Sequence, residues 1–227
     1  MKTVVKILLG VAIVFLVYLC VMSIVTPIQF ENTRTVRERA IVSHLIDIRA
    51  AQLEYKDQHN RFVSDLDSLV DFVKTGKKKI VLKEGTLTDA QLEAGLTEAK
   101  AVRIVNRGNK REIEENGLVG FRRDTTEVDV ITELYGNKYT RDNVADMVVI
   151  PYSGGKKFGI KVNNEYKNDI GIRVPLFEVT APYQSYLSDL DRQEMLNLID
   201  KARQMDKYAG LRVGSVEAPN NNAGNWE

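Results

Sequence analysis

The chain has 227 residues, with 32 basic and 31 acidic side chains, two histidines and one cysteine. Residues 1–30 hold two of the basic residues and no acidic one, so the remainder has a net charge of −1. This balance excludes the strong positive field of a protein that binds nucleic acid, and the single cysteine, Cys20, excludes an intramolecular disulfide. About 200 residues lie outside the N-terminal segment, enough for one elaborated domain or two small ones.

Residues 7–25 form an uninterrupted run of nineteen residues without a charge. As a helix this run is about 28 Å long, enough to cross the hydrocarbon core of a bilayer. The alternatives are a cleaved signal peptide and a lipoprotein signal. The run is too long for a signal peptide, Val21 is a poor residue at its only passable cleavage point, and Leu19 is not the small residue that should precede a lipid-modified Cys20. We therefore expect an uncleaved membrane anchor in residues 1–30.

The charged residues that flank this anchor give little indication of its orientation in the membrane. Two lysines precede the run and three arginines follow it closely, so the basic residues that mark a cytoplasmic flank are nearly balanced. The run begins almost at the first residue, as in signal anchors, and long domains are exported largely regardless of their charge. We expect a single-pass protein of a bacterial inner membrane with its C-terminal domain in the periplasm.

A stripe of large side chains follows the anchor in steps of three and four residues. Its members are Ile41, Leu45, Ile48, Gln52 and Tyr55. This spacing predicts an amphipathic stem helix over residues 33–58 that continues from the membrane. Pro27 predicts a kink between the anchor and the stem, because it cannot donate a backbone hydrogen bond.

The end of the stem helix is also marked. Asn60 readily adopts the left-handed conformation of a helix stop, and Phe62 follows it. Ser64, with Asp67 three residues later, predicts the cap of a second, short helix. The stem and this short capping helix together make up residues 31–73.

The middle of the chain mixes strand and helix patterns. Residues 80–82 predict a strand, and a capping box at residues 88–91 predicts a helix that runs to about Lys100. Residues 101–105 have the composition of a further strand. Residues 118–135 fit either a helix or an alternating strand, and both remain open.

The C-terminal half has clearer signals. The expected elements are a hairpin over residues 147–162, a strand over residues 172–180, a helix from Asp191 and a last strand over residues 211–216. Pro175 predicts an edge position for its strand, because proline cannot donate to a central ladder. Residues 219–227 have turn composition and predict a loose tail. Within this tail Trp226 is a candidate hook for a partner, because tryptophan offers a large apolar area.

Together these elements predict an α+β fold. A transmembrane helix continues into an amphipathic stem helix, and the stem packs on a mainly antiparallel sheet. The expected divisions are the anchor at 1–30, the stem and capping helix at 31–73, an α+β globular domain at 74–218 and a flexible tail at 219–227.

No motif in the sequence predicts a chemical reaction. The segment SGGKK at residues 153–157 lacks the spacing of a phosphate-binding loop, and Ser153 does not stand in a GxSxG motif. His44 and His59 fall on the stem helix and lack the spacing of a metal-binding pair. We therefore expect no catalytic residue, no cofactor and no metal, in a protein that is not an enzyme.

The sequence RAAQLEYKDQHNRFVSDLDSLVDF, residues 49–72, resembles the type IV pilin and pseudopilin superfamily. There the stem helix commonly ends in a similar AQ-x-x-Y stretch, followed by a short S-x-L-x-x-L helix. The matching residues are Gln52, Tyr55, Asn60, Arg61, Phe62, Ser64, Leu66 and Leu69. The usual prepilin leader pattern does not occur, since Gly10 is followed by VAIVF and the uncharged run contains no glutamate. The resemblance implies a long membrane-to-stem helix and a small antiparallel sheet.

We therefore expect a pilin-like structural or assembly subunit of a bacterial envelope, secretion or pilus-type machinery. Its expected partners are membrane lipid and other envelope proteins or copies of itself, and not nucleic acid. The residues expected to serve packing or interaction are Ile41, Leu45, Ile48, Gln52, Tyr55, Phe62 and, as a hook, Trp226. The alternative is a periplasmic binding or sensor module anchored by a single helix, and an enzyme of unrecognised type is a third hypothesis.

Overall fold

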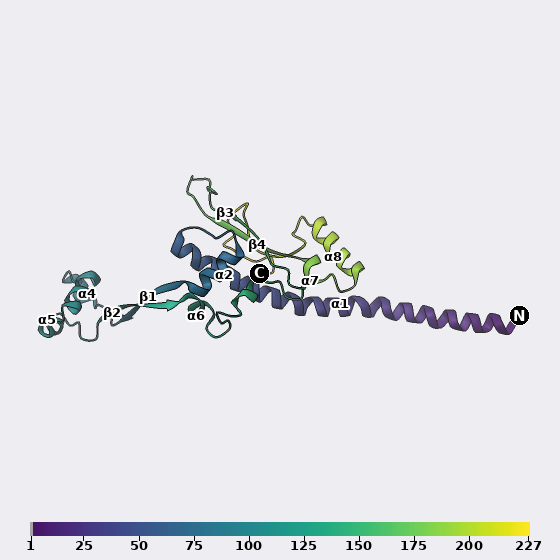
Figure 1. Ribbon diagram of the computed structural model, residues 1–227, viewed down its shortest axis with the longest axis horizontal. Coiled ribbons are helices and arrows are strands. Elements are labelled where there is room, and N and C mark those ends of the chain that lie inside the picture. The colour runs from purple at the N-terminus through teal and green to yellow at the C-terminus, as the bar shows by residue number, and fades with distance from the viewer. Residues whose placement is uncertain (1) are drawn as a thin grey trace. The chain divides into compact units, whose positions relative to one another are not determined.

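The computed structural model describes residues 2–227. Within them it confirms the α+β class, with a long N-terminal helix and two small antiparallel sheets (Figure 1). The chain divides into two compact units, which are described separately. The stem unit comprises the residues up to Val73 together with Tyr139–Glu227, and the inserted unit comprises Lys74–Lys138. The domain predicted over residues 74–218 is therefore divided between the two units.

Helix α1 (Lys2–His59) is 58 residues long and opens the stem unit. It joins the predicted anchor to the predicted stem without a break and includes Pro27, where the sequence predicts a kink. Proline removes one hydrogen bond, which does not end a helix that is regular on both sides. Asn60 ends α1 as predicted, because its φ is 56° and its N–H donates to the carbonyl oxygen of Lys56 at 2.7 Å.

Helix α2 (Leu66–Thr75) follows as the predicted short helix. Its buried side chains are Leu66, Leu69, Val70 and Val73. The predicted cap is wrong by one residue: the carboxylate of Asp65, rather than the hydroxyl of Ser64, accepts the backbone N–H of Ser68 at 2.7 Å. The helix therefore begins one residue later than a serine cap would place it.

Three strands of the stem unit form an antiparallel sheet in the order β3-β4-β5. They are β3 (Gly159–Asn163), β4 (Leu176–Pro182) and β5 (Gly210–Gly214). In the central strand, Val179 pairs with Ile160 on one side and with Val213 on the other. The predicted edge position is wrong, because Pro175 precedes the first residue of β4 and leaves the ladder intact.

The other elements of the stem unit flank this sheet. They are the 3-10 helix η1 (Val144–Val148), helix α7 (Tyr183–Tyr186) and helix α8 (Arg192–Gln204). Helix α8 begins as predicted, since the carboxylate of Asp191 accepts the N–H of Glu194 at 3.0 Å. The hairpin predicted over residues 147–162 is half correct: β3 is its second strand, but η1 replaces the first, and an isolated bridge joins Val149 to Lys157.

The core of the stem unit lies between one face of α1 and the sheet. Its fully buried side chains from α1 are Ile41, Leu45, Ile48 and Ala51, and those from the sheet include Phe177, Val179 and Val213. Phe62, just after α1, packs against Phe177 with ring centroids 4.6 Å apart. Each large apolar side chain contributes about 1.5–3 kcal/mol when it is fully buried. This burial explains why large residues recur every three or four positions in the stem.

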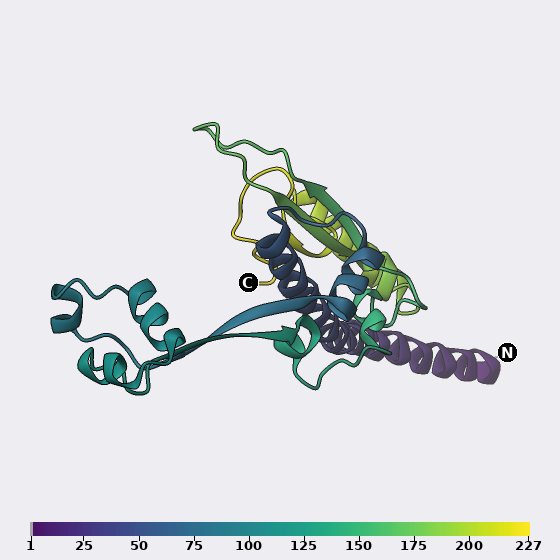
Figure 2. The ribbon, with the colours of Figure 1, turned by 60° about the vertical axis from the view of Figure 1, so that its left-hand side comes forward.

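The inserted unit is a two-stranded antiparallel ribbon that carries short helices (Figure 2). Its elements are β1 (Lys77–Glu84), α3 (Asp89–Glu93), α4 (Glu98–Arg107), α5 (Lys110–Glu115), β2 (Arg122–Asp129) and α6 (Val130–Tyr135). The ribbon pairs Lys77 with Asp129 at one end and Glu84 with Arg122 at the other. The unit has a small core of its own, which contains Ala101, Leu118 and Phe121.

Two predictions for this unit are wrong. The capping box is present, but α3 ends at Glu93, because Gly95 turns the chain with a left-handed φ of 78°. The predicted strand over residues 101–105 lies inside α4, where Ala101 is buried in the small core. Residues 118–135, for which helix and strand remain open from the sequence, contain both β2 and α6.

The C-terminal tail has defined contacts, whereas the sequence predicts a loose end. Gly224 bridges to Val213 of β5, and the N–H of Gly214 donates to the carbonyl oxygen of Ala223 at 3.0 Å. Farther on, the carboxylate of Glu227 lies 2.6 Å from Arg49 of α1. These contacts add the tail to the edge of the sheet.

Candidate functional site

The N-terminal half of α1 presents an apolar surface that the described chain does not cover. The exposed apolar side chains between Ile7 and Ile28 have exposed fractions from 39% for Met22 to 71% for Val14. This stretch rises about 32 Å along the helix axis, close to the thickness of about 30 Å of a bilayer's hydrocarbon core. Within residues 2–227, α1 is the helix that is long and apolar enough to span a membrane.

The predicted stem residues lie in the other half of α1 or just after it, and they face the interior of the stem unit. Ile41, Leu45, Ile48 and Gln52 have no exposed area, and Phe62 is 2% exposed. The stripe is therefore occupied by packing against the sheet and loops of this chain. It does not form a free surface for another molecule.

Gln52 is the polar member of the buried stripe. Its side-chain Nε2 donates to the carbonyl oxygen of Val63 at 2.8 Å, and its Oε1 accepts the N–H of Val63 at 3.1 Å. One amide side chain thus satisfies both backbone groups of a residue eleven positions later. The pair fixes the turn that connects α1 to α2.

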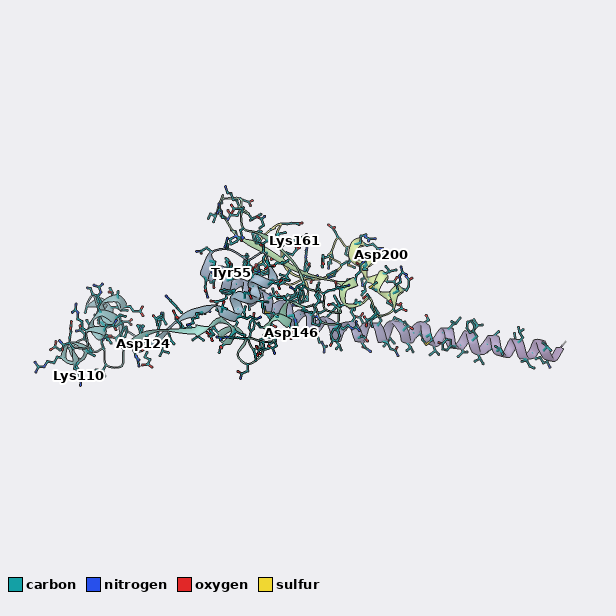
Figure 3. All side chains as sticks on the ribbon, in the orientation of Figure 1. Tyr55, Lys110, Asp124, Asp146, Lys161 and Asp200 are labelled. Atoms are coloured by element: carbon teal, nitrogen blue, oxygen red, sulfur yellow. The ribbon has the colours of Figure 1, made fainter. Side chains whose placement is uncertain are left out.

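Tyr55, the last predicted stem residue, is half-buried near the end of α1 (Figure 3). Its ring stacks on His59 with centroids 4.2 Å apart and meets Phe72 edge-on at 5.0 Å. The tyrosine therefore belongs to an aromatic cluster between α1 and α2.

Polar contacts gather where the apolar half of α1 ends. The guanidinium of Arg37 donates to Asp189 at 2.7 Å and to the carbonyl oxygen of Tyr186 at 2.6 Å, and it lies 5.1 Å from the ring centroid of Tyr152. The hydrogen bond from Arg37 lowers the pKa of the Asp189 carboxyl. These bonds fasten the segment after α7 to α1.

The next residue of α1, Glu38, extends this group of contacts. The hydroxyl of Tyr186, a fully buried side chain, donates to Glu38 at 3.3 Å. Arg34 places its Nε 3.3 Å from Glu38 and its Nη1 2.9 Å from Glu31. Burial raises the pKa of Glu38, and the charge of Arg34 opposes part of that rise. We call Arg34, Arg37, Glu38, Tyr186 and Asp189 the collar.

Sequence reasoning misses the collar. Its two arginines count in the sequence analysis only as charges that follow the anchor closely, and the sequence assigns no role to Glu38, Tyr186 or Asp189. The partners of Arg37 lie 149 and 152 residues away. No local pattern signals a contact at that separation.

Ser153 and Trp226, which the sequence analysis also considers, make contacts within the fold of this chain. Ser153 donates to the carbonyl oxygen of Ile150 at 2.7 Å and accepts the N–H of Lys156 at 2.9 Å, so its hydroxyl closes a turn. Trp226 is half-buried against Gly224, where an added Cβ would lie 2.4 Å from the indole ring.

The ring of His44 lies 6.4 Å from that of Phe158. Among the described residues, no group of three histidine, cysteine or acidic side chains is placed to hold a metal ion.

In comparisons with known proteins, no family, no curated protein and no solved structure matches this chain. The long N-terminal apolar helix and the small antiparallel sheet are compatible with a pilin-like architecture.

Proposed function

We propose that this protein is a membrane-anchored, pilin-like structural or assembly subunit of a bacterial envelope, secretion or pilus-type machinery, acting through protein-protein contacts. The observation that carries the proposal is the division of α1 into an exposed apolar half and a half that is buried in the stem unit. In this proposal the apolar half spans the inner membrane once, and the rest of the chain lies in the periplasm.

Covering the exposed half of α1 is strongly favourable in free energy. Fifteen large apolar side chains between Ile7 and Ile28 are exposed, and each gains about 1.5–3 kcal/mol when it is fully removed from water. Even partial coverage gains on the order of tens of kcal/mol, more than the 5–15 kcal/mol stability of a typical domain. Lipid or another protein must therefore cover this surface.

The second half of α1 restricts where lateral contacts can form. Its apolar stripe is buried inside the stem unit, so it cannot also bind a neighbouring subunit. In this proposal, lateral contacts form through the apolar half of α1, residues 7–28. Helices in lipid associate through close packing rather than through the hydrophobic effect.

Cysteine cross-linking in native membranes tests this proposal. Cys20 is exposed within the apolar half, so oxidation should give a covalent dimer that the Cys20→Ser variant cannot form. In that variant, cysteines introduced one at a time over residues 14–28 should cross-link with a period of about 3.6 residues. Monomer at every position would contradict lateral assembly.

Membrane attachment is tested separately. The protein should resist extraction by alkaline carbonate, and protease added to spheroplasts should digest the region beyond residue 30. Release by carbonate would contradict the anchor, and protection from protease would contradict the proposed orientation.

A further inference from the structure

The stem unit contains a cavity of about 490 Å³ bordered by α1, α8 and β5. Leu198 and Ala202 of α8, with Met205 just after it, supply apolar lining, while Arg34 of α1 and Arg212 of β5 supply charge. The cavity therefore offers both apolar and cationic contacts to one ligand.

Four basic side chains and one acidic side chain line this cavity: Arg34, Lys201, Lys207, Arg212 and Asp206. Arg34 is paired with Glu31 and Glu38, and Arg212 lies 3.6 Å from Glu178. The two lysines have no ion-pair partner among the residues that the structure describes, and one aspartate can offset only one of them. An anion in the cavity would thus meet lysine charge that is not already compensated.

The cavity lies close to the point where α1 leaves the apolar region. From Ile28, the last residue of the exposed apolar stretch, to Arg34 the helix rises about 9 Å. Side chains of a helix tilt toward its N-terminus, here toward the membrane. Asp191, which caps α8, lines a smaller cavity together with Thr26 and Gln29 of α1. The start of α8 therefore lies beside the segment that would cross the lipid headgroup layer, and the cavity, which is lined by the second half of α8 from Leu198 on, meets α1 at Arg34.

We propose that this cavity binds the phosphate headgroup of an anionic phospholipid, an inference that rests on the membrane anchor of the proposed function. Lys201 and Lys207 would contact the phosphate. The apolar side chains of α8 would cover the glycerol and the first methylene groups. A free phosphate ion would leave that apolar lining uncovered, which favours a lipid as the source.

The near-neutral chain has no long-range attraction for acidic lipid. It does not need one, because an anchored protein meets its headgroups at a high effective concentration. A local contribution from two lysines near the surface then suffices.

Native mass spectrometry of the full-length protein in detergent tests the proposal. The probes are phosphatidylglycerol and phosphatidylcholine, added at equal concentrations. The double variant Lys201→Gln/Lys207→Gln should bind phosphatidylglycerol about thirtyfold more weakly, at about 1 kcal/mol per lysine. The matched control is Lys161→Gln/Lys167→Gln, which removes the same charge from exposed positions on β3 and on the loop after it. Figure 3 labels Lys161 on β3 and, on α8, Asp200, the residue before Lys201.

Preference for phosphatidylglycerol that falls in the double variant but not in the control would support the cavity. Equal retention of the two lipids by the unaltered protein, or an equal loss in both variants, would overturn it. Displacement of the lipid by equimolar inorganic phosphate would identify a free phosphate site and overturn the lipid assignment.

Carbonate extraction of each variant separates this proposal from the proposed function. Variants that remain in the membrane while phosphatidylglycerol binding is unchanged would refute the cavity and leave the anchor intact. Extraction of the unaltered protein would refute the anchor itself.

Discussion

Gln52 stands inside an otherwise apolar stripe because the turn after α1 needs both a donor and an acceptor. The backbone N–H and carbonyl of Val63 both bond to its amide, and an unpaired buried backbone group costs roughly 1–3 kcal/mol. The pilin-like pattern draws attention to Gln52 from the sequence, whereas the role of its amide follows only from the structure.

Replacement of this amide should destabilise the stem unit. We expect Gln52→Ala to lower the free energy of unfolding by about 2–4 kcal/mol, because it leaves both groups of Val63 unpaired. Thermal unfolding in detergent micelles, followed by circular dichroism, measures the effect. The control Asp57→Ala, at an exposed position of the same helix, should change it by less than about 0.5 kcal/mol. Equal shifts in both variants would contradict the role assigned to Gln52.

The collar predicts a dependence of stability on pH. Because Arg37 lowers the pKa of Asp189 in the folded state, this pair stabilises the fold above the unfolded pKa of about 4 and loses its effect as the pH falls through the folded pKa. We expect the Tm to fall over this acidic range, and Asp189→Asn to remove part of the fall. The control is Asp169→Asn, at an exposed position, which should leave the fall of the Tm with pH unchanged. If Asp189→Asn does not alter the dependence of the Tm on pH, the stabilising role of the Arg37–Asp189 pair is contradicted.

Among the elements, helix ends are predicted better than strand positions. Asn60 and Asp191 act as the sequence indicates, because a cap depends on residues within one turn. The edge position of β4 and the first strand of the hairpin at residues 147–162 are predicted wrongly. A strand is defined by partners that are distant in sequence, so its neighbours cannot be read from its own composition.

The cap of α2 provides a test between two adjacent residues. We expect Asp65→Ala to lower the Tm by a few degrees, because the N–H of Ser68 loses its acceptor. Ser64→Ala should leave the Tm nearly unchanged, although the sequence favours Ser64 as the cap. The same melting experiment measures both variants. A larger decrease in Tm for Ser64→Ala than for Asp65→Ala would show that Ser64 is the cap.

In the whole molecule, the inserted unit has its own core and its own sheet. We expect the stem unit to fold without it when an Asn-Gly turn replaces residues 78–128. Lys77 and Asp129 are paired opposite each other in the ribbon, so a two-residue turn can join them. Hydrogen exchange of β4 amides measures the outcome, and protection should persist. Loss of protection would show that the stem unit depends on the inserted unit for its stability.

The sequence by itself determined the features that depend on composition and short-range spacing: the uncharged run, the buried stripe of the stem and the helix caps at Asn60, residues 88–91 and Asp191. These are local because helical periodicity and hydrogen bonds at helix ends involve residues a few positions apart. Only the tertiary structure decided the order of the strands, the bond from Arg37 to Asp189 and the cavity beside α8. Each of these joins segments far apart in the chain, and such contacts form only when the whole stem unit packs around α1.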